Sequence, residues 1–380
     1  MNAIGTHQKL SWTSIVGAGS LFPSAVPSQI NMPPAFTSQP FHGHTCPFAP
    51  GEGIVPAQSL RRLGRAQELA LTVCSLACKP SPPPGERTAT FVGTGMGESG
   101  SSARFLHDIL GPDPLPPRPL DFINAVHNSI ASETAVVLGL KGENCTFTHD
   151  AVSFELALSR AAYVLQRGKM DRVLVCGVDA LTPFAAVLGP GYGWWSDDAA
   201  SPRPILGALG TSRAAPGEGA GAFLLARAED ATEAEALARL LVTAVRPLPE
   251  KNVAACDPRE EVAFIQATLA RAGVSLGEIG FVLLGANGNP AWDAVYANVM
   301  AELAKSLPEK TVCGVYKHRC GEFHTAPALG LALAVDIVQT GTVPETIACV
   351  APPRPDRPIA TVLLYHVTAS GYHSVCVVAS

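Results

Sequence analysis

The sequence contains few charged residues and no strongly basic segment. Asp, Glu, Lys and Arg make up only 16% of the 380 residues, and the formal net charge is −5. Because nucleic-acid-binding surfaces are strongly basic, this balance argues against a nucleic-acid partner. The only local basic group, Arg61, Arg62 and Arg65, fits an ordinary solvated helix face.

Long apolar segments and paired cysteine motifs are also missing. No apolar run approaches the roughly 18 to 20 residues of a membrane span, and the longest, residues 329–338, is interrupted by Asp336. The first residues have no apolar h-region, which predicts no signal peptide. The ten cysteines include no CxxC pair, and several lie within apolar stretches. We therefore expect free, buried thiols, no metal site and a cytoplasmic location.

Hydrophobic residues, by contrast, are abundant. They make up 47% of the chain, which favours a large core together with an extensive buried subunit interface. The length is sufficient for two domains or for one large doubled domain.

Periodic apolar patterns predict strands that alternate with helices. We predict strands at residues 14–17, 88–92, 144–148, 172–178, 217–226, 281–284, 361–367 and 374–378. We predict helices at residues 59–78, 153–166, 258–272, 292–307 and 328–339. The third of these helices has Asp257 as a capping residue, Pro258 at its first position and Gly273 at its end.

The same order of elements occurs twice, which predicts an internally duplicated α/β fold with helices on both sheet faces. The polar run at residues 228–235 is the best boundary, so we divide the chain into residues 1–230, with a Pro- and Gly-rich N-terminal segment, and residues 231–380. The Gly-rich loop at residues 93–102 lacks the acidic residue that would bind a ribose. We therefore expect no dinucleotide cofactor.

Five segments resemble motifs of the β-ketoacyl synthases. They are SLRRLGRAQELAL, FINAVHNSIASETAVVLGLKGEN, SFELALSRAAYVLQRGKMDRVLVCGVDAL, GEGAGAFLL and KHRCGEFHTAPALGLALAV, in that order along the chain. The form FxNxVHN is most similar to the chain-length-factor branch of this family. The resemblance implies a thiolase-type duplicated fold, layered as helix, sheet, helix, sheet, helix.

The resemblance also implies a catalytic triad, and this sequence departs from it at each position. Ketosynthases carry the acyl chain on a Cys thiolate at a helix N-terminus, and two His side chains stabilise the malonyl enolate. Counting along the matched helix places Ala151 at the Cys position. Asn287 takes the place of the first His, and Glu322 that of the second, with His324 displaced by two residues. A methyl group forms no thioester, so we expect condensing activity to be lost.

The late Gly-rich turn of the family also differs. It is replaced here by residues 370–374, and we expect Tyr372 and His373 to fill the space beside the nucleophile position.

Other polar residues have more ordinary interpretations. Cys145 would be the replacement nucleophile nearest to Ala151, but a buried strand thiol is favoured. His149 and Asp150 suggest an acid–base pair, but adjacent residues at a strand end point apart, and we expect Asp150 to cap the next helix.

Two further pairs stay open. His127 and Asn128 fit either a pocket or a satisfied core pair. The Trp194–Trp195 pair is typical of a loop packed on a protein surface, more than of a cofactor cage.

The resemblance implies a non-condensing homologue that pairs with an active β-ketoacyl synthase subunit. In that role the chain completes a dimer, preferably a heterodimer with a homodimer as the alternative, and limits acyl length in a polyketide, aryl polyene or fatty-acid pathway. The carried ligand is the 4'-phosphopantetheine arm of an acyl-carrier protein, and no cofactor is expected. The tunnel and interface candidates are His127, Asn128, Ser132, Val136, Phe154, Tyr372 and His373.

Two other classes of function remain as alternatives. The first is an active acyltransferase or decarboxylase that uses Asn287, His324, His149 or Cys145. The second is an acyl- or carrier-binding protein without catalysis.

Overall fold

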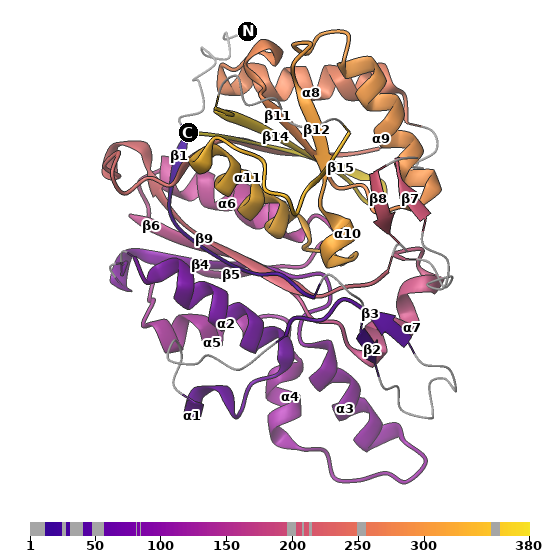
Figure 1. Cartoon of the computed structure of the whole chain (residues 1–380). Coiled ribbons are helices and arrows are strands. Elements are labelled where there is room, and N and C mark those ends of the chain that lie inside the picture. The colour runs from indigo at the N-terminus through magenta and orange to yellow at the C-terminus, as the bar shows by residue number, and fades with distance from the viewer. Residues whose placement is uncertain are drawn as a thin grey trace, which may run out of the picture.

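Helices and strands alternate along much of the chain, as the sequence predicts, but its periodic patterns did not predict the consecutive helices at residues 99–110, 119–125 and 129–138. Figure 1 shows the computed structural model, and the part of the chain that it describes comprises residues 12–24, 28–30, 41–47, 57–80, 82–83, 85–195, 203–206, 209–212, 215–248, 256–350 and 358–380.

The described part of the first half contains five strands of the main sheet and seven helices. The strands are β1 (Thr13–Leu21), β4 (Thr88–Gly93), β5 (Asn144–Phe147), β6 (Arg172–Asp179) and β9 (Gly219–Arg227). The helices are α1 (Ala57–Leu60), α2 (Arg65–Cys78), α3 (Ser99–Leu110), α4 (Pro119–Ala125), α5 (Ser129–Leu138), α6 (Ser153–Gln166) and α7 (Pro183–Gly191). Two small hairpins pair β2 (Ser28–Ile30) with β3 (Phe41–Gly43) and β7 (Arg203–Ile205) with β8 (Leu209–Ser212).

The second half contains the remaining strands and helices. The strands are β10 (Ala238–Pro247), β11 (Phe281–Leu284), β12 (Val312–Val315), β13 (Ala348–Cys349), β14 (Thr361–Val367) and β15 (Tyr372–Ala379). The helices are α8 (Pro258–Ala272), α9 (Pro290–Leu303), α10 (Lys317–Cys320) and α11 (Pro327–Thr340).

The sheet topology repeats, which confirms the predicted duplication. In the first half the strand order is β1-β9-β6-β4-β5, with two antiparallel and then two parallel pairings. In the second half the order β10-β15-β14-β11-β12 has the same sequence of directions, with β13 added at the edge. The halves join where β1 pairs with β10 at three residues. The division at residue 230 stays a prediction.

The elements form five layers (Figure 1). Helices α8 and α9 cover one outer face, and α2 and α5 cover the other. Between the two parts of the sheet lie α6 and α11, each in contact with strands of both halves. The strands β6 and β9 are buried on both faces, as their continuous apolar sequences predict. The central helical layer therefore brings the two halves together around one interior.

Local sequence signals account for several helices. Asp257 caps α8, since its Oδ1 accepts a hydrogen bond of 2.9 Å from the backbone N–H of Arg259. Gly273 ends that helix at φ +70°, a conformation that glycine adopts without strain. The predicted bounds of α6 agree with the observed ones.

The predicted helix at residues 59–78 is wrong in its first part, because the chain breaks between α1 and α2. Gly64 precedes α2 in an extended conformation, and a Cβ there would lie 2.1 Å from the Glu98 carboxyl carbon. That carboxylate accepts hydrogen bonds of 2.9 and 3.4 Å from two backbone N–H groups of the first turn of α2. A distant residue thus provides the cap that fixes where α2 begins.

All ten cysteines are free thiols in this structure. The cytoplasmic location stays a prediction. Among the described residues, helices long and apolar enough to cross a membrane are not found.

Glu155 connects the two halves through the central layer. It lies in the first turn of α6, and its Oε1 accepts a hydrogen bond of 2.7 Å from Ser374 Oγ on β15. Its Oε2 has no partner among the described residues. Burial raises the pKa of Glu155 to about 7, although the Ser374 hydrogen bond and the Lys317 charge oppose this rise. Folding therefore favours the neutral acid.

We predict that Glu155 makes stability fall as pH rises. The ordinary pKa of this group is 4.5 and the folded value is about 7. Its stabilising contribution is complete below pH 4.5 and is lost as pH rises through about 7. Glu155→Gln cannot ionise, so over this range its unfolding free energy should rise by roughly 3 kcal/mol relative to that of the unmodified chain.

Urea unfolding at a series of pH values measures this difference. Glu233→Gln, at an exposed position, is the control and should show no such trend. A difference between Glu155→Gln and the unmodified chain that stays constant with pH would identify another group as the one that titrates.

Candidate active-site cavity

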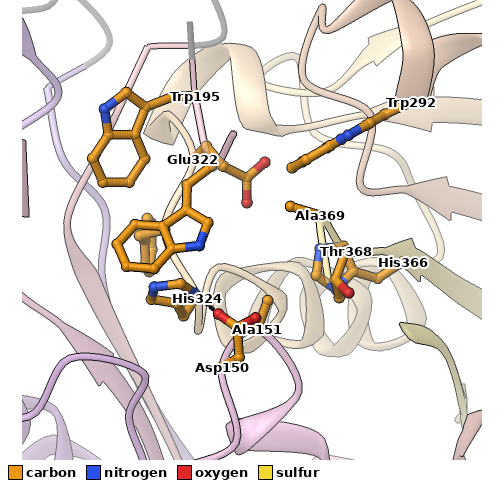
Figure 2. A pocket seen from close by; sticks show the side chains of 11 residues that line it. Asp150, Ala151, Trp195, Trp292, Glu322, His324, His366, Thr368 and Ala369 are labelled. Carbon is orange, nitrogen blue, oxygen red and sulfur yellow. Dashed lines mark ion pairs between the residues drawn. The ribbon is translucent and has the colours of Figure 1, made fainter. Parts of the chain in front are cut away.

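A small cavity lies at the N-terminal end of α6, between the two halves (Figure 2). Its volume of about 10 Å³ is near the lower limit for holding one water molecule. The walls come from the segment before α6, the end of α7, the first turn of α9, the segment after α10 and the end of β14. The lining residues are Asp150, Ala151, Trp194, Trp195, Trp292, Glu322, Phe323, His324, His366, Thr368 and Ala369.

Ala151 is placed where the sequence predicts, directly before a buried helix. Ser153 is the first residue of α6, and its Oγ donates a hydrogen bond of 2.7 Å to the backbone oxygen of Asp150. This contact holds a tight turn in which Asp150 adopts φ +50°, an uncommon conformation for a residue other than glycine. The turn directs the Ala151 methyl group toward the cavity.

Asp150 does not cap α6, so that prediction is wrong. Its carboxylate instead forms an ion pair with His324, with 2.9 Å between Oδ1 and Nδ1. Burial alone would lower the pKa of His324, but the Asp150 hydrogen bond and nearby carboxylates outweigh it and raise that pKa. Burial alone would raise the pKa of Asp150, but the hydrogen bond and charge of His324 outweigh burial and lower it. The charged pair is therefore the favoured state.

His324 is held in place from two further sides. The Trp194 ring meets its imidazole edge-on, with 4.4 Å between ring centroids. A Cβ at Gly95 would lie 2.3 Å from the imidazole, so the absence of a side chain there makes room for the ring. The His324 ring is thus fixed in place, and its Nδ1–H already has an acceptor in the Asp150 carboxylate.

Glu322 and Lys317 form a buried ion pair beside the cavity. Lys317 has no solvent exposure, and its Nζ lies 2.6 and 2.8 Å from the two carboxylate oxygens of Glu322. Asn287 Nδ2 donates a hydrogen bond of 2.6 Å to the same carboxylate. Figure 2 shows that this carboxylate points into the space between Trp292 and Ala369. Asn287 therefore lies behind Glu322 and does not line the cavity itself.

His366 completes this buried group. Its Nε2 lies 2.9 Å from Lys317 Nζ. Burial lowers the pKa of His366 well below its ordinary value, and the neighbouring Lys317 charge adds to this effect. His366 is therefore a neutral imidazole whose Nε2 accepts a hydrogen bond from the lysine. As a result, the cationic and amide donors here already have acceptors within the chain.

The remaining tunnel and interface candidates lie outside this cavity. Phe154 is buried in the core and packs on Phe223, with 5.9 Å between ring centroids. His127 and Asn128 are exposed at the start of α5, so neither the pocket nor the core interpretation holds for this chain alone. Ser132 and Val136 are exposed on one face of α5, four residues apart.

Tyr372 and His373 point to opposite faces of β15, as neighbours on a strand do. Tyr372 packs against His149, with 4.8 Å between ring centroids, and so lies near the nucleophile position. His373 instead contacts Glu261 on the outer face of the sheet. The expectation that His373 fills the space beside Ala151 is therefore wrong, since strand alternation turns it away.

Cys145 lies on β5, half-buried, and burial followed by the Glu143 charge raises the pKa of its thiol. This is the opposite of what a thiolate nucleophile needs.

Among the basic residues, Arg61 and Arg62 are exposed and Arg65 pairs with Glu218 at 2.6 Å.

The sequence interpretation missed the three tryptophans and the buried lysine. Trp194 and Trp195 were expected on a protein surface, but both line the cavity, and Trp195 is buried. The sequence did contain a signal for Lys317. This lysine follows the apolar strand β12 closely, and Glu322 comes five residues later, a spacing that suggests a local ion pair.

Comparison with known proteins places this geometry in context. The family model described as beta-ketoacyl synthase, N-terminal domain matches residues 39–231, just over half of the chain. A search among curated proteins finds no match.

Solved structures of the same fold cover nearly the whole chain. The ishigamide ketosynthase/chain length factor is similar at 20% identity and a TM-score of 0.78, over 97% of this chain and 99% of that one. AntDE:AntF, a type II PKS acyl-carrier protein in complex with its ketosynthase bound to the hexaketide, is similar at 18% identity and a TM-score of 0.75, with the same coverage.

A beta-ketoacyl synthase from Burkholderia phymatum is similar at 15% identity and a TM-score of 0.75, over 97% of this chain and 99% of that one. At these identities the likenesses show the fold, which is the thiolase-type fold that the sequence motifs implied. With the family match over residues 39–231, they lead to one conclusion: the chain belongs to the β-ketoacyl synthase family.

Proposed function

We propose that this chain is a non-condensing β-ketoacyl synthase homologue that acts like a chain length factor beside an active ketosynthase subunit. The observation that carries the proposal is the cavity at the start of α6. Its described lining contains a methyl group at Ala151 and no thiol, and its volume is about 10 Å³. An acyl thioester needs both a sulfur nucleophile and room for its chain.

The arrangement of polar groups supports the same conclusion. Enolate stabilisation requires donors that point at an empty position where charge will develop. Here the carboxylate of Glu322 accepts from both Lys317 and Asn287, and His324 pairs with Asp150. The donors on Lys317 and Asn287 and the Nδ1–H of His324 thus have acceptors within the chain, whereas the Nε1–H of Trp195 in the same lining has no partner among the described residues.

Two surface features support association with a partner. The edge strand β5 hydrogen-bonds to β4 on one side only among the described strands, and such an edge can pair with another chain. Large apolar side chains are also exposed on α3, α4 and α5 and on the segments that join them, and α3 and α4 extend from the body in Figure 1. They include Leu106, Ile109, Leu110, Leu115, Phe122, Ile123, Val126 and Val136. An apolar surface of this kind is typical of a protein interface.

We further propose that the dimer is preferably a heterodimer and that the partner carries the acyl chain from an acyl-carrier protein. The exposed face of α5 with Ser132 and Val136 would then close the far end of the partner's acyl tunnel. The solved ketosynthase/chain length factor and ketosynthase–carrier-protein structures of this fold are consistent with such an assembly.

We predict that the purified chain forms no acyl thioester. Incubation with an acyl-carrier protein that bears an acyl group, followed by intact-mass spectrometry, should detect no added mass on any of the ten cysteines. The partner ketosynthase in the same reaction should become acylated. A stable adduct that Cys145→Ser abolishes would contradict the proposal and favour the acyltransferase alternative.

We also predict that the size of residue 136 changes product length. Val136 is 75% exposed in the single chain. If it closes the tunnel, Val136→Phe should shift the products toward shorter chains and Val136→Ala toward longer ones. Each methylene is worth only on the order of 1 kcal/mol, so the distribution should shift without becoming a single product.

The measurement is product analysis after co-expression with the ketosynthase encoded nearby and co-purification of the two chains. Val350→Phe is the matched control, because Val350 is also exposed, at 60%, but lies in the second half of the chain. Failure of the two chains to co-purify, with unchanged products from the ketosynthase alone, would contradict the chain-length role.

A further inference from the structure

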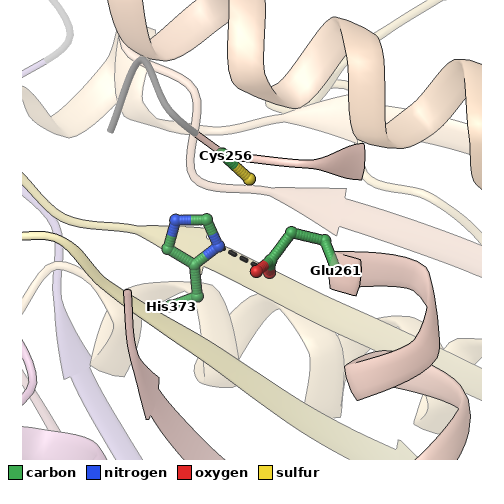
Figure 3. A group of neighbouring side chains, drawn as sticks. All are labelled: Cys256, Glu261 and His373. Atoms are coloured by element: carbon green, nitrogen blue, oxygen red, sulfur yellow. Dashed lines mark hydrogen bonds and ion pairs between the residues drawn. The ribbon is translucent and has the colours of Figure 1, made fainter. Parts of the chain in front are cut away.

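A second cluster of reactive side chains lies on the outer face of the second half (Figure 3). Cys256 lies shortly before α8, Glu261 is near the start of α8 and His373 is on β15. One potential ligand atom from each lies within 4.8 Å of the other two. Glu261 and His373 are fully buried, and Cys256 is half-buried.

Strand alternation separates this cluster from the cavity. Tyr365 and His366 are neighbours on β14, and His373 and Ser374 are neighbours on β15. His366 and Ser374 face the central layer and approach Glu155, whereas Tyr365 and His373 face α8. The outer cluster is therefore independent of the acyl site and of the function proposed above.

The hydrogen bonds of the cluster meet at one ring nitrogen of His373. His373 Nδ1 lies 2.6 Å from Glu261 Oε2 and 2.8 Å from the Tyr365 hydroxyl. Arg246 pairs with the other oxygen of Glu261. Nδ1 is thus the ring nitrogen that faces Glu261. An ion shared by the two side chains would take the place of the proton between Nδ1 and Oε2.

We propose that Cys256, Glu261 and His373 bind one divalent transition-metal ion of the zinc type. A thiolate, an imidazole and a carboxylate form the mixed donor set that such ions prefer. Ligand atoms around a tetrahedral zinc ion lie about 3.3 to 3.8 Å apart, so small side-chain movements would complete the site. Water would fill the fourth position.

The surrounding charges favour a cation. Glu261, Asp257 and Glu260 place negative charge near the Cys256 thiol, and Arg246 offsets only part of it. A thiol gives up its proton when it binds such an ion, so the bound thiolate adds to this negative charge.

Cobalt titration of the full-length, chelator-treated chain tests this proposal. Co²⁺ bound to a thiolate gives a near-ultraviolet charge-transfer band, and we expect this band to saturate at one ion per chain. Cys256→Ser should abolish the band and weaken binding by more than about tenfold. Cys349→Ser, which removes another half-buried thiol, should leave both unchanged.

A second readout covers the case in which Cys256→Ser folds poorly. Zn²⁺ should raise the thermal unfolding temperature of the unmodified chain and of Cys349→Ser. Absence of the charge-transfer band in the unmodified chain, or a band that persists in folded Cys256→Ser, would overturn the proposal.

Discussion

An ammonium group without solvent exposure requires a counter-charge, and Glu322 provides it for Lys317. Both carboxylate oxygens lie within 2.8 Å of Nζ. Removing one member of such a pair strands a buried charge at a cost of about 3–5 kcal/mol. The identity of residue 322 is thus tied to stability, and its carboxylate occupies one wall of the cavity. The polar groups around it follow from this pair, since Asn287 and His366 both hydrogen-bond to it.

Paired charges and aromatic rings together explain why the cavity is so small. Asp150 and His324 form a second ion pair at the turn before α6, and Trp194 packs directly on it. A working condensing site must keep empty volume and unpaired donors, both of which reduce stability. Here the same positions hold two ion pairs and packed indoles, although the Nε1–H of Trp195 and Nδ1 of His366 have no hydrogen-bond partner among the described residues.

The sequence predicts best those elements whose signals are local. The bounds of α6 and β11 and both ends of α8 follow from periodicity and from capping residues such as Asp257 and Gly273. The position of Ala151 before α6 follows from counting along a matched helix. None of these depends on contacts with distant residues.

Predictions failed where a distant residue competes with a local signal. Glu98 provides the cap that breaks the predicted first helix, and it lies more than thirty residues from the Ala66 amide that it binds. Asp150 has the right position to cap α6, but its ion pair with His324 holds it in another conformation. His373 faces the outer side of the sheet because of its place in the alternation of β15. The register of β15 is set by its pairing with β14 and β10, which are distant information for a local pattern.

The repeated topology gives the second half two chemically different faces. On the inner face, His366 and Ser374 approach Glu155 of the first half, so changes there affect how the halves pack. On the outer face, Tyr365 and His373 both hydrogen-bond to Glu261 on α8, and Tyr365 also packs on Tyr296 of α9. Because each strand residue can face only one side, the residues that approach the cavity cannot also take part in the outer cluster. The outer face can therefore change its side chains without altering the cavity, and the inner face can change without disturbing the outer one.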